Sequence, residues 1–175
     1  MDSMRVRAVF PGGHLAGELR GRSDVVVSFT PGSYARFDER EIERQLASVA
    51  KLLWTARMKE YYRAVSESVG QEVTQEPPAV GRQDQEYYAA RDDLVAEGWS
   101  TDGRVRIVTQ GMLRWSVTVA DGTLRTLTEQ EFADRVGEAA ARLIADQMAK
   151  IRVLKDRCYG RELHRYVVEA LVVDR

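Results

Sequence analysis

The stretch Leu113–Gly122, LRWSVTVADG, shows the fold most clearly. Its apolar residues alternate with polar ones, which is typical of a strand buried on one face, and the closing Asp-Gly pair favours a tight turn. A long helix is expected next. Thr128 and Glu131 have the spacing of a capping box, and an apolar stripe then runs from Phe132 to Cys158, interrupted by Gln147. The sequence therefore predicts a strand followed by a long helix.

A related pattern lies 90 residues earlier in the chain. Asp24–Thr30 predicts a strand, Asp38 and Glu41 match a second capping box, and an apolar stripe follows from Ile42 to Tyr61. At this offset the glycines expected in turns coincide, as do the caps and the stripes: Gly21 with Gly111, Gly32 with Gly122, Glu41 with Glu131. Coincident placement of this kind indicates an internal repeat.

The leading strands leave the repeat open to other interpretations. Arg5-Val6-Arg7 resembles Arg104-Val105-Arg106 at an offset of 99 rather than 90, so the first strand could match either of two positions. The alternative to a repeat is an ordinary α+β domain in which similar strand–helix patterns arose independently.

The expected fold is α+β, with antiparallel sheet packed against helices in two units related by a pseudo-two-fold axis. The expected division is a first ββα unit at 1–67, a linker at 68–82 that contains Pro77-Pro78, a second αββα unit at 83–160, and a tail at 161–175. A lead helix is expected at Gln83–Glu97. The tail is apolar enough to pack back as a strand or as a short helix, and the sequence does not decide between them.

The composition argues against several classes of function. The 175 residues carry a formal net charge of −1, with 44% hydrophobic residues and two histidines. Neither a signal peptide nor a transmembrane segment is expected, and the single cysteine, Cys158, fits a reducing cytoplasm. Because metal sites and catalytic triads need clustered histidine, cysteine or carboxylate, we expect a cytoplasmic, non-enzymatic protein without metal, cofactor or catalytic residues.

Basic residues gather in two kinds of place. Arginines alternate with apolar residues on two predicted strands, and cations outnumber acids near the end of the second long helix. Such clusters bind phosphates, although cations also suit helix C-termini and exposed strand faces without any ligand. The candidate contacts to nucleic acid or to a partner are Arg5, Arg7, Arg104, Arg106, Lys150, Arg152, Lys155 and Arg157.

The second unit resembles the YbaB/EbfC family. The resemblance covers roughly residues 83–158. Residues 14–66 resemble the family more weakly and lack the lead helix. It is carried by the lead helix and by three runs that follow the family's order: Gly103–Val108, Leu113–Val119 and Leu127–Ala133. The resemblance implies helix–sheet–helix units that form homodimers, several of which bind DNA as nucleoid-associated proteins. A tandem copy would then imitate that dimer within one chain.

The function expected from this resemblance is DNA binding by a nucleoid-associated module. The alternative is a protein–protein adaptor or chaperone, since similar domains occur among type VII secretion accessory proteins. The net charge of −1 and the acidic middle of the chain depart from a DNA-binding pattern. A small-ligand pocket is a third reading, which would require a deep cavity with convergent polar groups. Open sheet edges would also allow a further homodimer.

Overall fold

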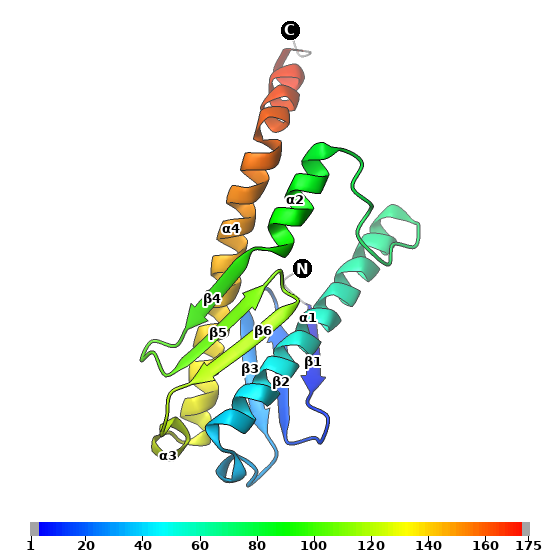
Figure 1. Ribbon diagram of the computed structural model, residues 1–175. Helices are drawn as coiled ribbons and strands as arrows, with labels where there is room; N and C mark the ends of the chain where they lie inside the picture. The colour runs from blue at the N-terminus through cyan, green and yellow to red at the C-terminus, as the bar shows by residue number, and fades with distance from the viewer. Residues whose placement is uncertain (1–3, 173–175) are drawn as a thin grey trace.

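The computed structural model describes the backbone of residues 4–172 and the side chains of residues 4–160, and Figure 1 shows an α+β molecule. Two antiparallel sheets have the strand orders β1-β2-β3 and β4-β5-β6, which confirms the expected fold class and the antiparallel pairing. The strands are β1 (Arg5–Val9), β2 (Leu15–Arg20), β3 (Asp24–Phe29), β4 (Val95–Trp99), β5 (Val105–Gln110) and β6 (Arg114–Val119). The helical segments are η1 (Tyr34–Arg36), α1 (Glu39–Val69), α2 (Arg82–Asp92), α3 (Thr123–Thr126) and α4 (Glu129–Val172).

The two sheets have the same register at an offset of 90 residues. Arg5 pairs with Arg20 in the first sheet, and Val95 pairs with Gln110 in the second. The turns agree as well, because Gly21 and Gly111 have φ values of 58° and 59°. β1 therefore corresponds to β4, and the offset of 99 suggested by the Arg-Val-Arg runs is wrong.

The first unit has three strands where the sequence predicted two. The additional strand is β2, whose signal is weak because Ala16 and Gly17 have low strand propensity. Gly17 has a packing role here. A Cβ atom at this position would lie 2.7 Å from Cγ1 of Val49, so the glycine lets α1 pass close over the sheet.

The lead helix of the second unit is shorter than expected. It ends at Asp92 as α2, and the residues expected to finish it form the strand β4 instead. The acidic composition of the segment and the glycine at position 98 concealed this strand, because acidic residues and glycine have low strand propensity. In the structure, Gly98 lies where β4 meets α4, because a Cβ atom there would overlap the backbone of Ala139 and Leu143. The second unit is therefore αβββα, with the short helix α3 between β6 and α4, rather than αββα.

The far end of α4 also differs from expectation. Residues 161–172 form neither a returning strand nor a separate short helix, because their backbone continues α4 as far as Val172. Residues 173–175 lie outside the described part of the chain. α1 ends at Val69, where Gly70 adopts the left-handed conformation, with φ of 67°, that commonly terminates helices. Residues 71–81, with Pro77-Pro78, connect α1 to α2 without helix or strand.

Each long helix packs on both sheets. α1 contacts β1 and β2 of its own sheet and β6 of the other, whereas α4 contacts β4 and β5 of its own sheet and β3 of the other. Both helices begin at the same end of the molecule and diverge toward the other end, with α2 lying along α4 (Figure 1). One hydrophobic core therefore joins both halves of the chain.

Aromatic contacts connect the two halves at the helix starts. Phe132 of α4 is fully buried, and its ring lies 6.2 Å from that of Phe29 and 5.8 Å from that of Tyr34. The Tyr34 hydroxyl donates a hydrogen bond of 3.1 Å to the backbone oxygen of Leu127. Burial, with the carboxylates of Glu129 and others nearby, raises the pKa of Tyr34 to about 12, so this donor keeps its proton.

The caps predicted from sequence differ in completeness. Thr128 and Glu131 form a reciprocal capping box, with bonds of 2.8 Å from the Thr128 N–H to Glu131 and 3.3 Å from the Glu131 N–H to Thr128. At Asp38 only one half forms, because its carboxylate accepts from the Glu41 N–H at 2.7 Å while the Glu41 side chain bonds Gln45.

A Thr128→Ala variant is expected to lose about 1 kcal/mol of unfolding free energy, because the Glu131 N–H loses its acceptor and the hydroxyl no longer holds the Glu131 carboxylate in place. Urea unfolding followed by circular dichroism measures the change. The control is Gln130→Ala, an exposed position in the same turn, which is expected to change stability by less than about 0.5 kcal/mol. Equal losses in both variants would contradict the role of the cap.

Candidate functional site

A cavity of about 630 Å³ lies between the two sheets and the two long helices. Both sheets contribute apolar side chains to its wall, among them Val25 and Val27 of β3 and Trp115 and Val117 of β6. The volume falls within the range of small-molecule binding sites in proteins, roughly 300 to 1,000 Å³. The third hypothesis from the sequence, a small-ligand pocket, required a deep cavity with convergent polar groups.

The helical walls are two facing stripes. α1 contributes residues at steps of three and one from Leu46 to Arg57. α4 contributes Val136 and then, after a step of four, residues at steps of three and one from Ala140 to Asp156. At 1.5 Å of rise per residue these stripes are about 16 and about 30 Å long, so the cavity is elongated along the helices. Both stripes are apolar near the helix starts and charged at their other end.

The charged residues define one end of the cavity, here called the mouth: Arg57 of α1, Arg91 of α2, and Arg152, Lys155 and Asp156 of α4. The Arg91 guanidinium is already compensated, because it lies 2.5 Å from a Glu76 carboxylate oxygen and 3.0 Å from one of Asp92. Arg152 and Lys155 are exposed and have no ion pair with the described side chains. The mouth therefore carries uncompensated positive charge.

Arg57 is the most constrained cation of the mouth. It is partly buried, donates a 2.8 Å hydrogen bond to the backbone oxygen of Arg22, and has no carboxylate partner among the described side chains. Burial lowers its pKa from the usual value. A partly desolvated guanidinium without a counter-charge is unfavourable, and a nearby anion would stabilise it.

Gln147 is the polar residue that interrupts the apolar stripe of α4. It lines the cavity, and its Oε1 atom is buried without a hydrogen-bond partner. Under the offset of 90, Gln147 corresponds to Arg57, so the two helices place their first polar wall residue at the same level. Met148 and Ile151 still line the cavity beyond this level, so polar and apolar side chains alternate in the α4 wall from here to the mouth.

The arginines predicted on strand faces lie on two different sheets. Arg5 and Arg7 are exposed on β1, and Arg5 lies 3.3 Å from Glu18. Arg106 of β5 is paired with Glu97 at 2.7 Å, and its guanidinium lies 4.8 Å from the centre of the Trp99 ring. Arg104 bonds Thr126 at 2.5 Å and lies 3.6 Å from Asp102. Most of these charges are therefore compensated within the fold.

The cations predicted on the second helix divide into three groups. Lys150 is tied to the fold by bonds of 2.7 Å to Asp146 and 2.9 Å to the backbone oxygen of Val95. Arg152 and Lys155 belong to the mouth, whereas Arg157 is exposed and does not line the cavity. The structure thus brings two of the eight predicted contact residues to the cavity.

Sequence reasoning missed Arg57 and Arg91, and it treated Trp54 and Trp115 as core residues, although both line the cavity. One signal was available. Arg57 continues the apolar steps of α1, and an arginine in that position either lies outside the core or borders a cavity. Arg91 carried no comparable signal. Its position depends on the ion pair with Glu76, which lies in the segment before α2, and no local sequence pattern predicts that pair.

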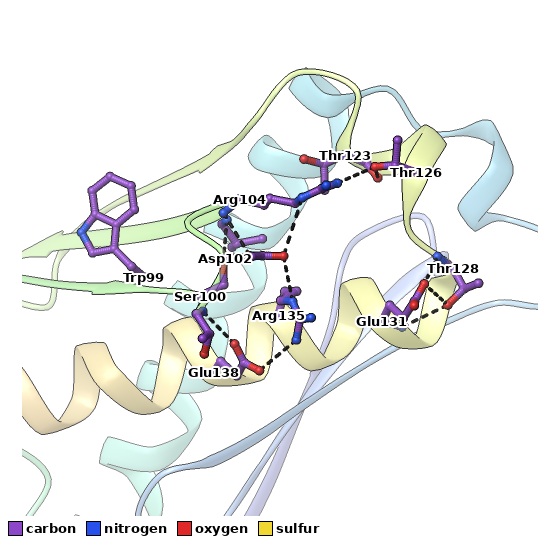
Figure 2. A network of polar contacts seen from close by, with 12 residues as sticks. Trp99, Ser100, Asp102, Arg104, Thr123, Thr126, Thr128, Glu131, Arg135 and Glu138 are labelled. Carbon is purple, nitrogen blue, oxygen red and sulfur yellow. Dashed lines mark hydrogen bonds and ion pairs between the residues drawn. The ribbon is translucent and has the colours of Figure 1, made fainter.

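A polar network holds the β4–β5 turn against α4, and Figure 2 shows Asp102 between Arg104 and Arg135. Arg135 bonds Asp102 at 2.9 Å and Glu138 at 3.0 Å, and Glu138 accepts the Thr101 N–H at 2.8 Å. This backbone hydrogen bond, with further help from Arg135, lowers the pKa of Glu138 from its usual 4.5. The network is a structural clamp.

The stability of the protein is expected to decrease in acid. A carboxyl whose folded pKa is depressed stabilises the fold above its unfolded pKa, and this contribution is lost as pH falls through the folded pKa. Unfolding free energy measured from pH 7 to pH 3 should therefore decline below about pH 4.5. A Glu138→Gln variant keeps an acceptor for the Thr101 N–H and should show a shallower decline. An identical pH profile in both proteins would contradict the assignment.

Within the described residues, no three histidine, cysteine, aspartate or glutamate side chains are grouped closely enough to hold a metal ion. No helix in the described part of the chain is long and apolar enough to span a membrane. None of the known family models, curated proteins or solved structures compared with the chain matches it. The cavity, its mouth and the exposed cations are the features on which a function can be argued.

Proposed function

We propose that the chain is a non-enzymatic binding protein with a YbaB/EbfC-like arrangement, in which two βββα units imitate a dimer within one chain. Two observations support the arrangement. Strand bounds, registers and turn conformations correspond at an offset of 90 residues. The packing is also reciprocal, because each long helix crosses to the last strand of the other unit's sheet.

The binding element of this proposal is the central cavity, which holds the apolar part of a ligand. The observation that carries it is the apolar wall, built by both sheets and both helices around about 630 Å³ of unfilled space. Removing apolar surface from water contributes roughly 25 cal/mol per Å², so an occupant that fills this space gains affinity without rearranging the fold.

Nile red, an uncharged apolar dye, tests this proposal. Its fluorescence should rise when it enters the cavity, with saturable binding by the intact chain. Ala140→Trp fills the cavity from the middle of α4 and should abolish the rise. The matched control is Ala145→Trp, which adds the same ring to an exposed position of the same helix and should leave binding unchanged. Equal dye binding by both variants would reject the cavity as the site.

DNA binding is a second candidate, favoured by the four of the eight predicted cations that are exposed and have no ion pair with the described side chains: Arg7, Arg152, Lys155 and Arg157. Affinity should then fall steeply as salt rises, because bound phosphates release counterions. A gel shift with duplex DNA at low salt tests it. Absence of a complex at micromolar protein would reject this candidate and leave the cavity proposal intact.

A protein adaptor or chaperone of the secretion-accessory kind is the third candidate. It is favoured by three exposed apolar side chains on the two edges of the second sheet: Val95 and Trp99, at the two ends of β4, and Leu113, just before β6, are 49%, 43% and 63% exposed. Affinity purification of the tagged chain should then recover one protein partner, which a Trp99→Ser, Leu113→Ser double variant loses. Recovery that is equal with the double variant would reject this surface.

A further inference from the structure

The mouth of the cavity carries positive charge that no described carboxylate compensates. Three of its cations, Arg57, Arg152 and Lys155, have no carboxylate partner among the described side chains, and Asp156 is the single carboxylate that lines it. Exposed lysine and arginine side chains on a helix are common and carry no meaning by themselves. Arg57 differs, because it is partly buried in the cavity wall beside Trp54 and still lacks a counter-charge.

The position of these cations matters as much as their number. Arg57 lies at the end of the α1 stripe, and Arg152 and Lys155 lie at the end of the α4 stripe. Because both helices begin at the same end of the molecule (Figure 1), these ends of the stripes lie at the same end of the cavity. The cavity is therefore polarised, with an apolar interior and a positive mouth.

The length and the volume of the cavity favour some apolar ligands over others. Its helical walls extend for about 16 and about 30 Å, which suits a long and flexible chain better than a compact ring system. Side chains of both sheets and both helices line it, and its volume falls within the range of small-molecule sites. A protein segment is accordingly the less favoured occupant, and the experiment below includes it as a contrary outcome.

Resting on the proposed role of the cavity, we infer that the ligand is a single-chain amphiphile with an anionic headgroup. Its acyl or alkyl chain lies along the facing stripes of α1 and α4. Its carboxylate or phosphate lies at the mouth, where Arg57, Arg152 and Lys155 supply hydrogen-bond donors and positive charge. The anion also gives the partly buried Arg57 the counter-charge that the fold does not provide.

Displacement of Nile red by three compounds of equal chain length tests the inference: dodecanoate and dodecylammonium below their micelle concentrations, and dodecanol below its solubility limit. Dodecanoate should displace the dye at roughly tenfold lower concentration than dodecanol, because charged hydrogen bonds to the mouth add to the same apolar contribution. Dodecylammonium should be the weakest. Dodecyl phosphate is compared with dodecanoate to show which anionic head the mouth prefers.

Two variants show whether the mouth causes this preference. Arg152→Gln with Lys155→Gln changes only exposed positions, so the fold is expected to be retained. The dodecanoate preference should then fall severalfold, while dodecanol displaces the dye as before. Arg57→Gln should reduce the preference further, and circular dichroism establishes that this variant is folded. Exposed Arg114, on the strand β6, provides a matched control, because Arg114→Gln should leave the preference unchanged.

The possible failures are distinguishable. Equal displacement by dodecanoate and dodecanol would overturn the inference and leave the cavity as a site for an uncharged apolar ligand. Failure of Nile red and all alkyl compounds to bind would overturn both the inference and the proposed function. If no compound binds, but a co-purifying protein is lost in Ala140→Trp and kept in Ala145→Trp, the occupant is a protein segment and the inference is wrong.

Discussion

A Gly98→Ala variant is expected to lose about 3 kcal/mol of unfolding free energy, or to fail to fold. The added methyl would overlap the Ala139 carbonyl oxygen and the Leu143 backbone nitrogen, and neither can rotate away as a side chain can. The strand β4 and the helix α4 must therefore move apart, and overpacking of a core commonly costs between about 1 and 3 kcal/mol even when side chains can adjust. Urea unfolding followed by circular dichroism measures the loss.

Two other glycines are controls for this prediction. At Gly17 the corresponding methyl would meet the side chains of Val49 and Leu53, which are able to adjust, so Gly17→Ala should cost less. At Gly81 nothing lies within 4 Å, and Gly81→Ala should be close to neutral. If Gly98→Ala were as stable as Gly81→Ala, the close crossing of β4 and α4 would be contradicted.

A Phe132→Ala variant is expected to lose about 3 to 5 kcal/mol, the usual cost of removing a fully buried phenylalanine. The ring belongs to the second half of the chain but lies against Phe29 and Tyr34 of the first. Its removal should destabilise both halves together. Tryptophan fluorescence and circular dichroism should therefore report one common unfolding transition at a lower urea concentration.

The matched control for Phe132 is Val153→Ala on the same helix. Val153 is 68% exposed, so this variant should change stability by less than about 0.5 kcal/mol. Two separate transitions in Phe132→Ala, or a loss no larger than that of Val153→Ala, would show that the ring does not join the halves.

The strands and helices with strong local signals were predictable from the sequence. β3 and β6 alternate clearly and end in glycine turns, and α1 and α4 begin at recognisable caps. β2 and β4 were not predictable as strands, because Gly17 and Gly98 weaken the local pattern and are explained only by the helices that pass over them. β2 and β4 form strands because of contacts with residues distant in the sequence, and a local sequence pattern cannot predict such contacts.

The candidate site was less predictable than the fold. Arg152 and Lys155 were recognised as cations, but their place at the mouth depends on Arg57, a residue almost a hundred positions earlier. A cavity forms where two apolar stripes face each other without meeting, and each stripe alone looks like an ordinary core face. Gln147 was the visible exception in its stripe, and in the structure it lines the cavity with its side-chain oxygen lacking a hydrogen-bond partner.

The most direct measurement of the central claim uses the positions of the three tryptophans. Trp54 and Trp115 line the cavity, whereas Trp99 lies beside Arg106 on the outer face of β4, 43% exposed. Dodecanoate is titrated into a Trp99→Phe variant and into a Trp54→Phe, Trp115→Phe variant. We predict a saturable change in tryptophan emission in the first protein and none in the second. No change in the first, or a change confined to Trp99, would contradict binding in the central cavity.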